Sequence, residues 1–415
     1  MNFLRRSYPA LRALCQRPSM AVSGQDINPT LLSDSGRRAE CLPAFRVLLD
    51  SAARPSGPRA LGRLLVVAVA ALAAAATAAD ASPAARRLQS PSTSEIARAG
   101  TITDTTLTPA GADRVARTAS WGGVYTTPSG ETVKVYASNT YPQDPAVGQR
   151  WADFLATLVH GPELGTITAY LAPLTEVQGL CGAQALACYS PRDSLLVAPG
   201  DDPYADTSAE AVVTHEYGHH VANNRQNPPW AAVDWGAKRW ASYMQVCAKT
   251  KQGTFSPGAE TLPAYRVNPG EGWAESYRVL NQRKAGLVES PWDIVARALY
   301  PDDGALSRLE QDVVTPWTAP TAESRSGSVS QQTRIRSYTV ATPLDGTLKV
   351  SLRGPRTAKL TLDLFSGTTR IGHAVKTANA TSTSTSLTIC GQRSVGIRLT
   401  RTAGAGAFAL AISKP

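Results

Sequence analysis

Two histidines four residues apart are the feature that most restricts how this chain folds. They belong to the stretch His215-Glu216-Tyr217-Gly218-His219. In an α-helix, residues i and i+4 lie on one face, one turn apart. Two imidazoles placed in this way can bind a single metal ion, with nitrogen–zinc distances of about 2.0–2.1 Å. The spacing therefore predicts a helix over residues 208–224 that faces a metal site.

Glu216 follows the first histidine directly, so it would lie beside the metal and could accept a proton from an activated water molecule. Three of the five histidines of the chain fall within His215–His220, which argues against the alternative of a helix that carries histidines by chance. His220 is rotated by about 100° from its neighbour around the helix axis. We therefore expect His220 to miss the metal and to be structural or at the surface.

A catalytic zinc ion needs a third protein ligand and an open position for water. The longer pattern HExxHxxGxxH would place Gly at 222 and His at 225, where this chain has Ala222 and Arg225, so that class is excluded. Glu271 and Glu275 are four residues apart on one face of a helix that we expect to begin at Asn268. One carboxylate can bind the metal while the other holds a ligand imidazole. The alternative is a pair of solvated surface carboxylates.

The segments HEYGHH and YRVNPGEGWAESYRVLN together resemble the Glu-ligand zincins (gluzincins), and within them the anthrax lethal factor type. In that family a tyrosine precedes the second, Glu-x-x-x-Glu helix. The resemblance implies that Glu271 is the third zinc ligand and that Glu275 is the outer partner of His215. It also implies that Tyr265 stabilises the oxyanion or protonates the leaving group. The offset of Tyr265 differs by one residue from the family pattern, so an ordinary packing tyrosine remains the alternative.

The fold class expected is an α+β zincin-like catalytic domain followed by an all-β sandwich. We place the catalytic domain at 119–320 and the accessory sandwich at 328–415. After Pro320, six short segments alternate apolar and polar residues between turns, which is typical of a sandwich. This second domain is similar to the accessory β-domains of secreted bacterial peptidases.

Apolar spacing within the catalytic domain predicts its elements. Thr207 and Glu210 resemble a capping box at the start of the histidine helix, and the strand 194–200 is the expected sheet edge for a peptide substrate. The remaining elements expected are a hairpin at 122–138, a helix at 144–160, a strand at 166–173, and helices at 230–249, from 268 onward and at 291–300.

An apolar run from Leu64 to Ala79 follows two arginines and ends at a small-x-small site, which are the parts of a secretory signal. Its length of about 24 Å is short for a bilayer core of about 30 Å, so we expect a signal peptide at 59–81 and no stable membrane anchor. A membrane-anchored protein is the alternative. Signals normally begin a protein, so residues 1–58 are expected to be an over-extended start. Residues 82–118 are expected to be a linker or short propeptide.

Cysteine usage agrees with secretion. Beyond the leader the chain has Cys181, Cys188, Cys247 and Cys390, which permit three full pairings. The seven-residue spacing of the first two suits a small closed loop, so Cys181–Cys188 and Cys247–Cys390 are favoured. The alternative of four free thiols is less compatible with an extracellular protein.

The net charge of +10 is spread thinly, without a Lys/Arg run or aromatic–basic interleaving, so no nucleic-acid partner is expected. The sequence predicts a secreted zinc metalloendopeptidase with one catalytic Zn²⁺, Glu216 as general base and a peptide or protein substrate. Two alternatives remain: a secreted binding protein with a non-catalytic zincin-like lobe, or a hydrolase of cell-wall peptides. The pattern does not fix an oligomeric state.

Overall fold

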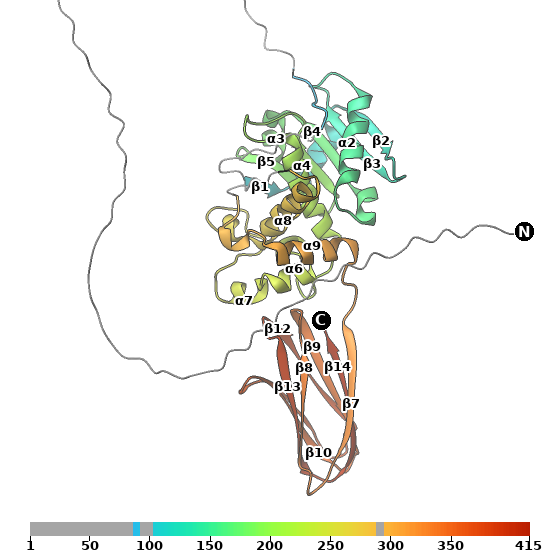
Figure 1. Ribbon diagram of the computed structural model, residues 1–415, viewed down its shortest axis with the longest axis vertical. Helices are drawn as coiled ribbons and strands as arrows, with labels where there is room; N and C mark the ends of the chain where they lie inside the picture. Colours follow the sequence, from blue (N-terminus) through green and yellow to red (C-terminus); the bar gives the residue numbers. More distant parts are fainter. Residues whose placement is uncertain (1–85, 92–102, 288–293) are drawn as a thin grey trace, which may run out of the picture. The chain divides into compact units, whose positions relative to one another are not determined.

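The computed structural model describes residues 86–91, 103–287 and 294–415. The expected N-terminal extension (1–58) and signal peptide (59–81) lie outside these residues. An α/β part comes first and sheets of a sandwich follow (Figure 1). Within the described ranges, none of the helices has the length and apolar character needed to span a bilayer.

The α/β part is built on a mixed six-stranded sheet with the order β1-β5-β6-β4-β3-β2 among the described residues. Strand β1 runs parallel to β5, and β5 runs antiparallel to β6. Strands β6, β4 and β3 are mutually parallel, and β2 closes a hairpin with β3. The strands are β1 (Thr103–Thr106), β2 (Ser120–Thr126), β3 (Thr132–Ser138), β4 (Thr168–Ala172), β5 (Ala185–Ser190) and β6 (Leu195–Pro199).

Some helices pack against the two faces of this sheet, and others pack on those helices. They are α1 (Pro109–Arg117), α2 (Pro145–Thr157), α3 (Leu174–Cys181), α4 (Ala209–Asn223), α5 (Ala232–Trp235), α6 (Lys238–Tyr243), α7 (Val246–Lys251), α8 (Pro269–Lys284) and α9 (Asp303–Val314). Short 3-10 helices occur at η1 (Pro162–Thr166), η2 (Ala264–Val267) and η3 (Arg297–Leu299).

Alternating side chains of β6 show how the sheet separates two apolar layers. Leu196 and Ala198 belong to the main core, which includes residues of α2, α4 and α8. Leu195 and Val197 belong to a smaller core with residues of α1 and α3. Strand β6 is therefore buried on both faces. It lies between β5 and β4, so the expectation that 194–200 forms the sheet edge was wrong; on that side, β1 is the outermost described strand.

The N-cap of α8 is the residue expected from the sequence, whereas the N-cap of α4 differs from the expected one by one residue. Asn268 caps α8 by accepting a hydrogen bond from the backbone of Gly270 at 3.0 Å. Helix α4 is capped by Ser208, whose hydroxyl accepts from the backbone of Ala211 at 3.2 Å. The expected capping box at Thr207 was wrong by one residue.

The expected helix over 230–249 is broken into α5, α6 and α7. Gly236 follows α5 with a φ of 73°, and Gln245 precedes α7 with a φ of 58°. A left-handed residue cannot continue a right-handed helix. In the expected helix at 291–300, the described residues contain only η3, while α9 was not expected.

Residues 82–118, expected to be a linker or propeptide, contain folded structure. Strand β1 pairs with β5, and α1 packs through Ala112 and Val115 in the smaller core. Leu88 is buried in the main core. Part of this range therefore pairs and packs with the α/β part.

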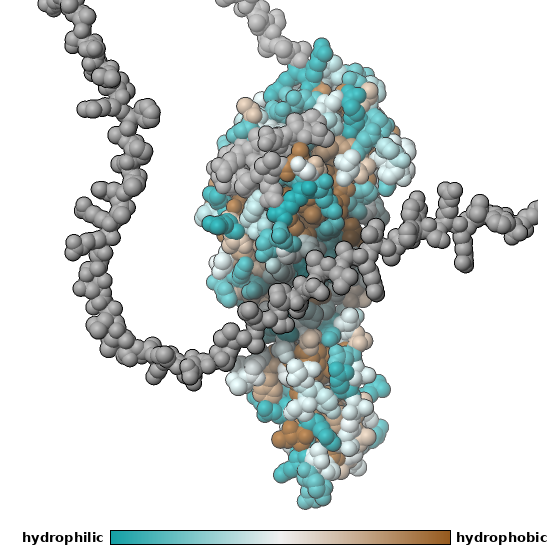
Figure 2. All heavy atoms as spheres, viewed as in Figure 1, coloured by the Kyte–Doolittle hydropathy of each residue, from teal (hydrophilic) through white to brown (hydrophobic). Residues whose placement is uncertain are grey.

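The C-terminal residues form two four-stranded antiparallel sheets, with the orders β11-β10-β13-β8 and β12-β9-β14-β7 among the described residues. Inward-facing residues such as Leu348, Leu362 and Leu399 fill one shared core. Figure 2 shows hydrophilic and neutral side chains over most of the visible face of these strands. The strands are β7 (Thr321–Val329), β8 (Ile335–Ala341), β9 (Gly346–Arg353), β10 (Lys359–Ser366), β11 (Thr369–Lys376), β12 (Ser382–Ile389), β13 (Ser394–Ala403) and β14 (Gly406–Lys414).

Both favoured disulfides are present. Cys181–Cys188 joins the end of α3 to β5, and Cys247–Cys390 joins α7 to the residue after β12. Near the second disulfide, the buried amine of Lys238 donates to the backbone carbonyl of Asp345 at 3.0 Å. The α/β part and the sandwich are thus connected by a covalent bond and by hydrogen bonds.

We expect loss of Cys247–Cys390 to destabilise the protein more than loss of Cys181–Cys188. The chain-entropy relation gives about 5 kcal/mol for the separation of 143 residues and about 2.5 kcal/mol for that of seven. The double variant Cys247→Ser/Cys390→Ser should therefore lose about 2.5 kcal/mol more of unfolding free energy than Cys181→Ser/Cys188→Ser. Urea unfolding followed by tryptophan fluorescence measures the difference, and equal losses would contradict it.

Candidate metal centre

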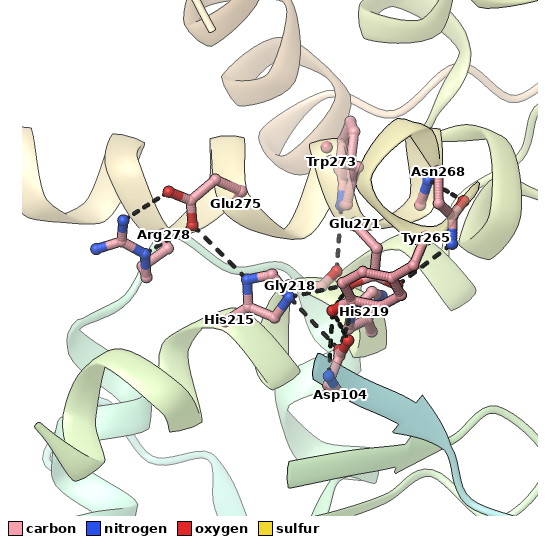
Figure 3. Close-up of polar contacts among 12 residues, drawn as sticks. Asp104, His215, Gly218, His219, Tyr265, Asn268, Glu271, Trp273, Glu275 and Arg278 are labelled. Atoms are coloured by element: carbon pink, nitrogen blue, oxygen red, sulfur yellow. Dashed lines mark hydrogen bonds and ion pairs between the residues drawn. The ribbon is translucent and has the colours of Figure 1, made fainter. Parts of the chain in front are cut away.

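Close contact between α4 and α8 brings the two sequence motifs together. A side chain added at Gly218 would place its Cβ only 3.0 Å from the Cα of Ala274. The indole nitrogen of Trp273 donates to the carbonyl of Gly218 at 3.1 Å (Figure 3). Glycine at 218 therefore permits α8 to lie against the histidine face of α4.

The structure places three of the expected ligands around one point. Nε2 of His215 and Nε2 of His219 each lie 3.4 Å from Oε2 of Glu271. All three side chains are buried. The alternative of solvated surface carboxylates on α8 is thereby excluded, since Glu271 and Glu275 are 7% and 0% exposed.

A fourth donor, Asp104 of β1, completes this cluster. Its Oδ2 lies 3.0 Å from Nε2 of His219 and 3.5 Å from Nε2 of His215 (Figure 3). Asp104 was not expected from the sequence, because it is separated from His219 by 115 residues and stands alone in a threonine-rich stretch. Nothing in its local pattern indicates a ligand.

The spacing of the donor atoms fits a metal ion. Ligands at about 2.0–2.1 Å in a tetrahedron are separated from one another by about 3.3–3.4 Å. The donor–donor distances given above run from 3.0 to 3.5 Å, and the four donor atoms all lie within 4.8 Å of one another. The buried cluster Asp104, His215, His219 and Glu271 could therefore hold a metal ion.

Without a metal, the charges of this cluster balance one another. Burial raises the pKa of Asp104, but hydrogen bonds and charge from His215 and His219 outweigh it and hold that pKa well below its ordinary value. Burial lowers the pKa of His219, but the charge of Glu271 and the hydrogen bond that His219 donates to Asp104 raise it to about 10. Metal binding would therefore have to displace protons from the imidazoles.

Glu275 occupies the outer position expected for it. Its Oε2 lies 3.8 Å from Nδ1 of His215, on the side away from the cluster. Arg278, itself buried, binds both oxygens of Glu275 at 2.6 and 2.8 Å. Burial raises the pKa of Glu275, but the charge and hydrogen bonds of Arg278 outweigh this and leave the pKa below its ordinary value. A carboxylate held in this place can orient the ring of His215.

Tyr265 lies on η2 and reaches the cluster. Its hydroxyl donates to Oδ1 of Asp104, lies 3.1 Å from Oε2 of Glu271, and accepts from the backbone N–H of Asp104 at 3.1 Å. Burial and the two carboxylates raise the pKa of Tyr265 well above its ordinary value. The hydroxyl therefore stays protonated and able to donate.

Glu216 is buried and faces a small cavity beside the cluster. The cavity is also lined by Asp104 and Tyr265, and by apolar side chains from β5 and α4. Among the described residues, Oε2 of Glu216 has no hydrogen-bond partner. Burial and the charge of Asp104 raise the pKa of Glu216 well above its ordinary value. An unpartnered carboxyl oxygen in this place is suited to receive a proton.

His220 points away from the cluster, as its helix position predicts. Its Nδ1 lies 2.9 Å from the hydroxyl of Tyr189, and its Nε2 lies 2.9 Å from the carbonyl of Glu163. The side chain is fully buried, so His220 is structural rather than a surface residue.

Comparison with known proteins adds little to this geometry. No protein-family model matches the chain, and no curated protein matches it. Among solved structures, the pre-peptidase C-terminal domain of a Bacillus anthracis collagenase is 14% identical, with 22% of this chain and 87% of that domain covered, at a TM-score of 0.18. The Yersinia pseudotuberculosis-derived mitogen is 12% identical over 23% of this chain and 87% of that one, at a TM-score of 0.19. At such low scores these likenesses support no conclusion about function.

We expect Glu275→Gln to weaken metal binding by about 10- to 100-fold, because the outer carboxylate no longer orients His215 as a charged acceptor. Competition with a chelator, using zinc as the probe ion, measures this. Glu310→Gln is the matched control, since Glu310 pairs with Lys284 at the surface and does not belong to the cluster. Equal zinc affinity in both variants would show that Glu275 does not strengthen zinc binding by orienting His215.

Proposed function

We propose that this protein is a secreted zinc-dependent endopeptidase with a zincin-like catalytic domain. One observation carries the proposal: two imidazole nitrogens of α4 each lie 3.4 Å from a carboxylate oxygen of α8, and the buried Glu216 stands on the same helix. A structural metal site would not need Glu216. Its unpartnered oxygen beside the cluster favours catalysis over a binding role.

Zinc is the metal that this donor set favours. Imidazole nitrogens with carboxylate oxygens in a tetrahedral arrangement are typical of zinc. Calcium and magnesium prefer six or more oxygen ligands or octahedral coordination. The ligands we assign to catalytic zinc are His215, His219 and Glu271.

The chain's own residues would divide the remaining tasks of peptide hydrolysis. When bound, a zinc ion supplies a Lewis acid for the scissile carbonyl and lowers the pKa of water toward about 7. Glu216 accepts the proton of the attacking water and returns it to the departing amine. Tyr265 donates to the oxyanion, a role worth about 2.7–4 kcal/mol for a single donor in other enzymes. Glu275 keeps His215 in the tautomer that presents Nε2.

A secreted location rests on two observations. The two disulfides are consistent with an oxidising, extracellular compartment. The run from Leu64 to Ala79 has the composition of a secretory signal.

We expect Glu216→Gln to keep one zinc per chain and to lose peptidase activity by about 10²- to 10⁴-fold, because the amide cannot accept a proton. Zinc content and cleavage of denatured casein, measured on the same preparations, test this. Glu310→Gln serves as the control and should keep both.

Three other outcomes would change the proposal. Zinc binding without cleavage of casein or of peptidoglycan stem peptides, both in the unaltered protein and in Asp104→Ala, which removes the fourth donor, would favour a binding protein. Cleavage of the stem peptides alone would restrict the substrate to cell-wall peptides. Full activity in Glu216→Gln would reject the mechanism itself.

A further inference from the structure

Asp104 of β1 lies among the candidate metal ligands, so a strand of this chain itself fills the site. Asp104 is 6% exposed, and its Oδ2 approaches both ligand imidazoles. Its Oδ1 and its backbone N–H both engage the hydroxyl of Tyr265 (Figure 3). Asp104 thus contacts both the imidazoles that we assign as metal ligands and Tyr265, the side chain to which we assign stabilisation of the oxyanion.

Four protein donors are one too many for a catalytic zinc site. Catalytic sites have three protein ligands and keep the fourth position for water or substrate, whereas sites with four protein ligands are closed. Three donors come from α4 and α8, which pack tightly against each other. Asp104 is the donor that comes from a separate, short strand.

The pairing of β1 resembles that of a bound peptide. Its four residues are extended and lie along β5, with Thr105 opposite Cys188 and Thr106 opposite Tyr189. The backbone N–H of Leu107 donates to the carbonyl of Tyr189 at 2.9 Å. Extended peptides commonly bind proteins by adding a strand to a sheet edge. Removing β1 would expose such an edge on β5, next to the ligand imidazoles.

We propose that Thr103–Thr106 blocks the metal site, with Asp104 as the fourth ligand that excludes water and substrate. Once β1 leaves, β5 is the strand on which an extended substrate peptide pairs. This inference rests on the proposed function, because it names how the peptidase site is closed. The protein as described is then the latent form of the enzyme.

The fourth ligand position can be tested without peptidase activity. In protein loaded with Co²⁺, the visible absorption spectrum reports the ligand set, and acetohydroxamate is a probe that binds an open metal position. We expect the spectrum of the unaltered protein to resist the probe and that of Asp104→Ala to shift with it. Asp104→Asn keeps the size of the side chain and should respond in the same direction. Asp113→Ala removes an exposed carboxylate of α1 and should behave like the unaltered protein.

Peptidase activity gives the second readout. A ligand in the same chain competes with substrate at an effective concentration on the order of millimolar, so Asp104→Ala should raise the rate of casein cleavage by about tenfold or more. The double variant Asp104→Ala/Glu216→Gln should lose that gain. This result would show that the gain comes from the proposed site.

Three results separate the two proposals. If acetohydroxamate shifts the spectra of the unaltered protein and Asp104→Ala equally, the site is already open and the blocking role is overturned. Loss of the metal from both Asp104→Ala and Asp104→Asn, with normal folding by circular dichroism, would make Asp104 a permanent ligand and would also overturn it. If Asp104→Ala opens the site but no variant cleaves any peptide, the blocking role stands and the peptidase function fails.

Discussion

The contact between α4 and α8 is the constraint on which the metal centre depends. The two helices approach so closely that a methyl group at Gly218 would meet the backbone of Ala274. This distance sets the 3.4 Å separations between the imidazoles of α4 and the carboxylate of α8. The capping bond of Asn268 fixes where α8 begins and therefore which turn carries Glu271. A small shift along either helix would separate the donors.

Burial of so many charges has a cost that the arrangement offsets by pairing each one. An isolated buried ion is strongly unfavourable, whereas a hydrogen-bonded and paired ion is tolerated. Arg278 lies against Glu275, and Glu275 in turn faces His215. Two further carboxylates face the imidazoles from β1 and α8. The ionisable side chains from Arg278 to Asp104 therefore form one connected series of charges. Removing a charge at one end of this series changes the electrostatic environment of the groups at the other end.

Local patterns predicted the parts of the site that lie on helices. The i, i+4 spacing of His215 and His219 and the cap at Asn268 are short-range features, so the sequence displays them directly. Glu271 and Glu275 were expected from the same spacing and from a family resemblance. Asp104 was not expected, because its partner on α4 lies 115 residues away and no period marks it. The edge strand was misassigned for a related reason. Strands β1 and β5 are far apart in the sequence but pair in the sheet, and only such tertiary contacts show that β6 is an interior strand.

The Cys247–Cys390 bond determines whether the protein separates into fragments when a protease cleaves its backbone. Helix α8, with both of its carboxylates, lies within the 143-residue loop that this bond closes. A single nick anywhere inside that loop leaves the two fragments covalently joined. Proteolytic cleavage there would be invisible on a non-reducing gel and would appear only after a thiol is added. The protein can thus be cut between helix α8 and its C-terminal strands while the two pieces stay joined.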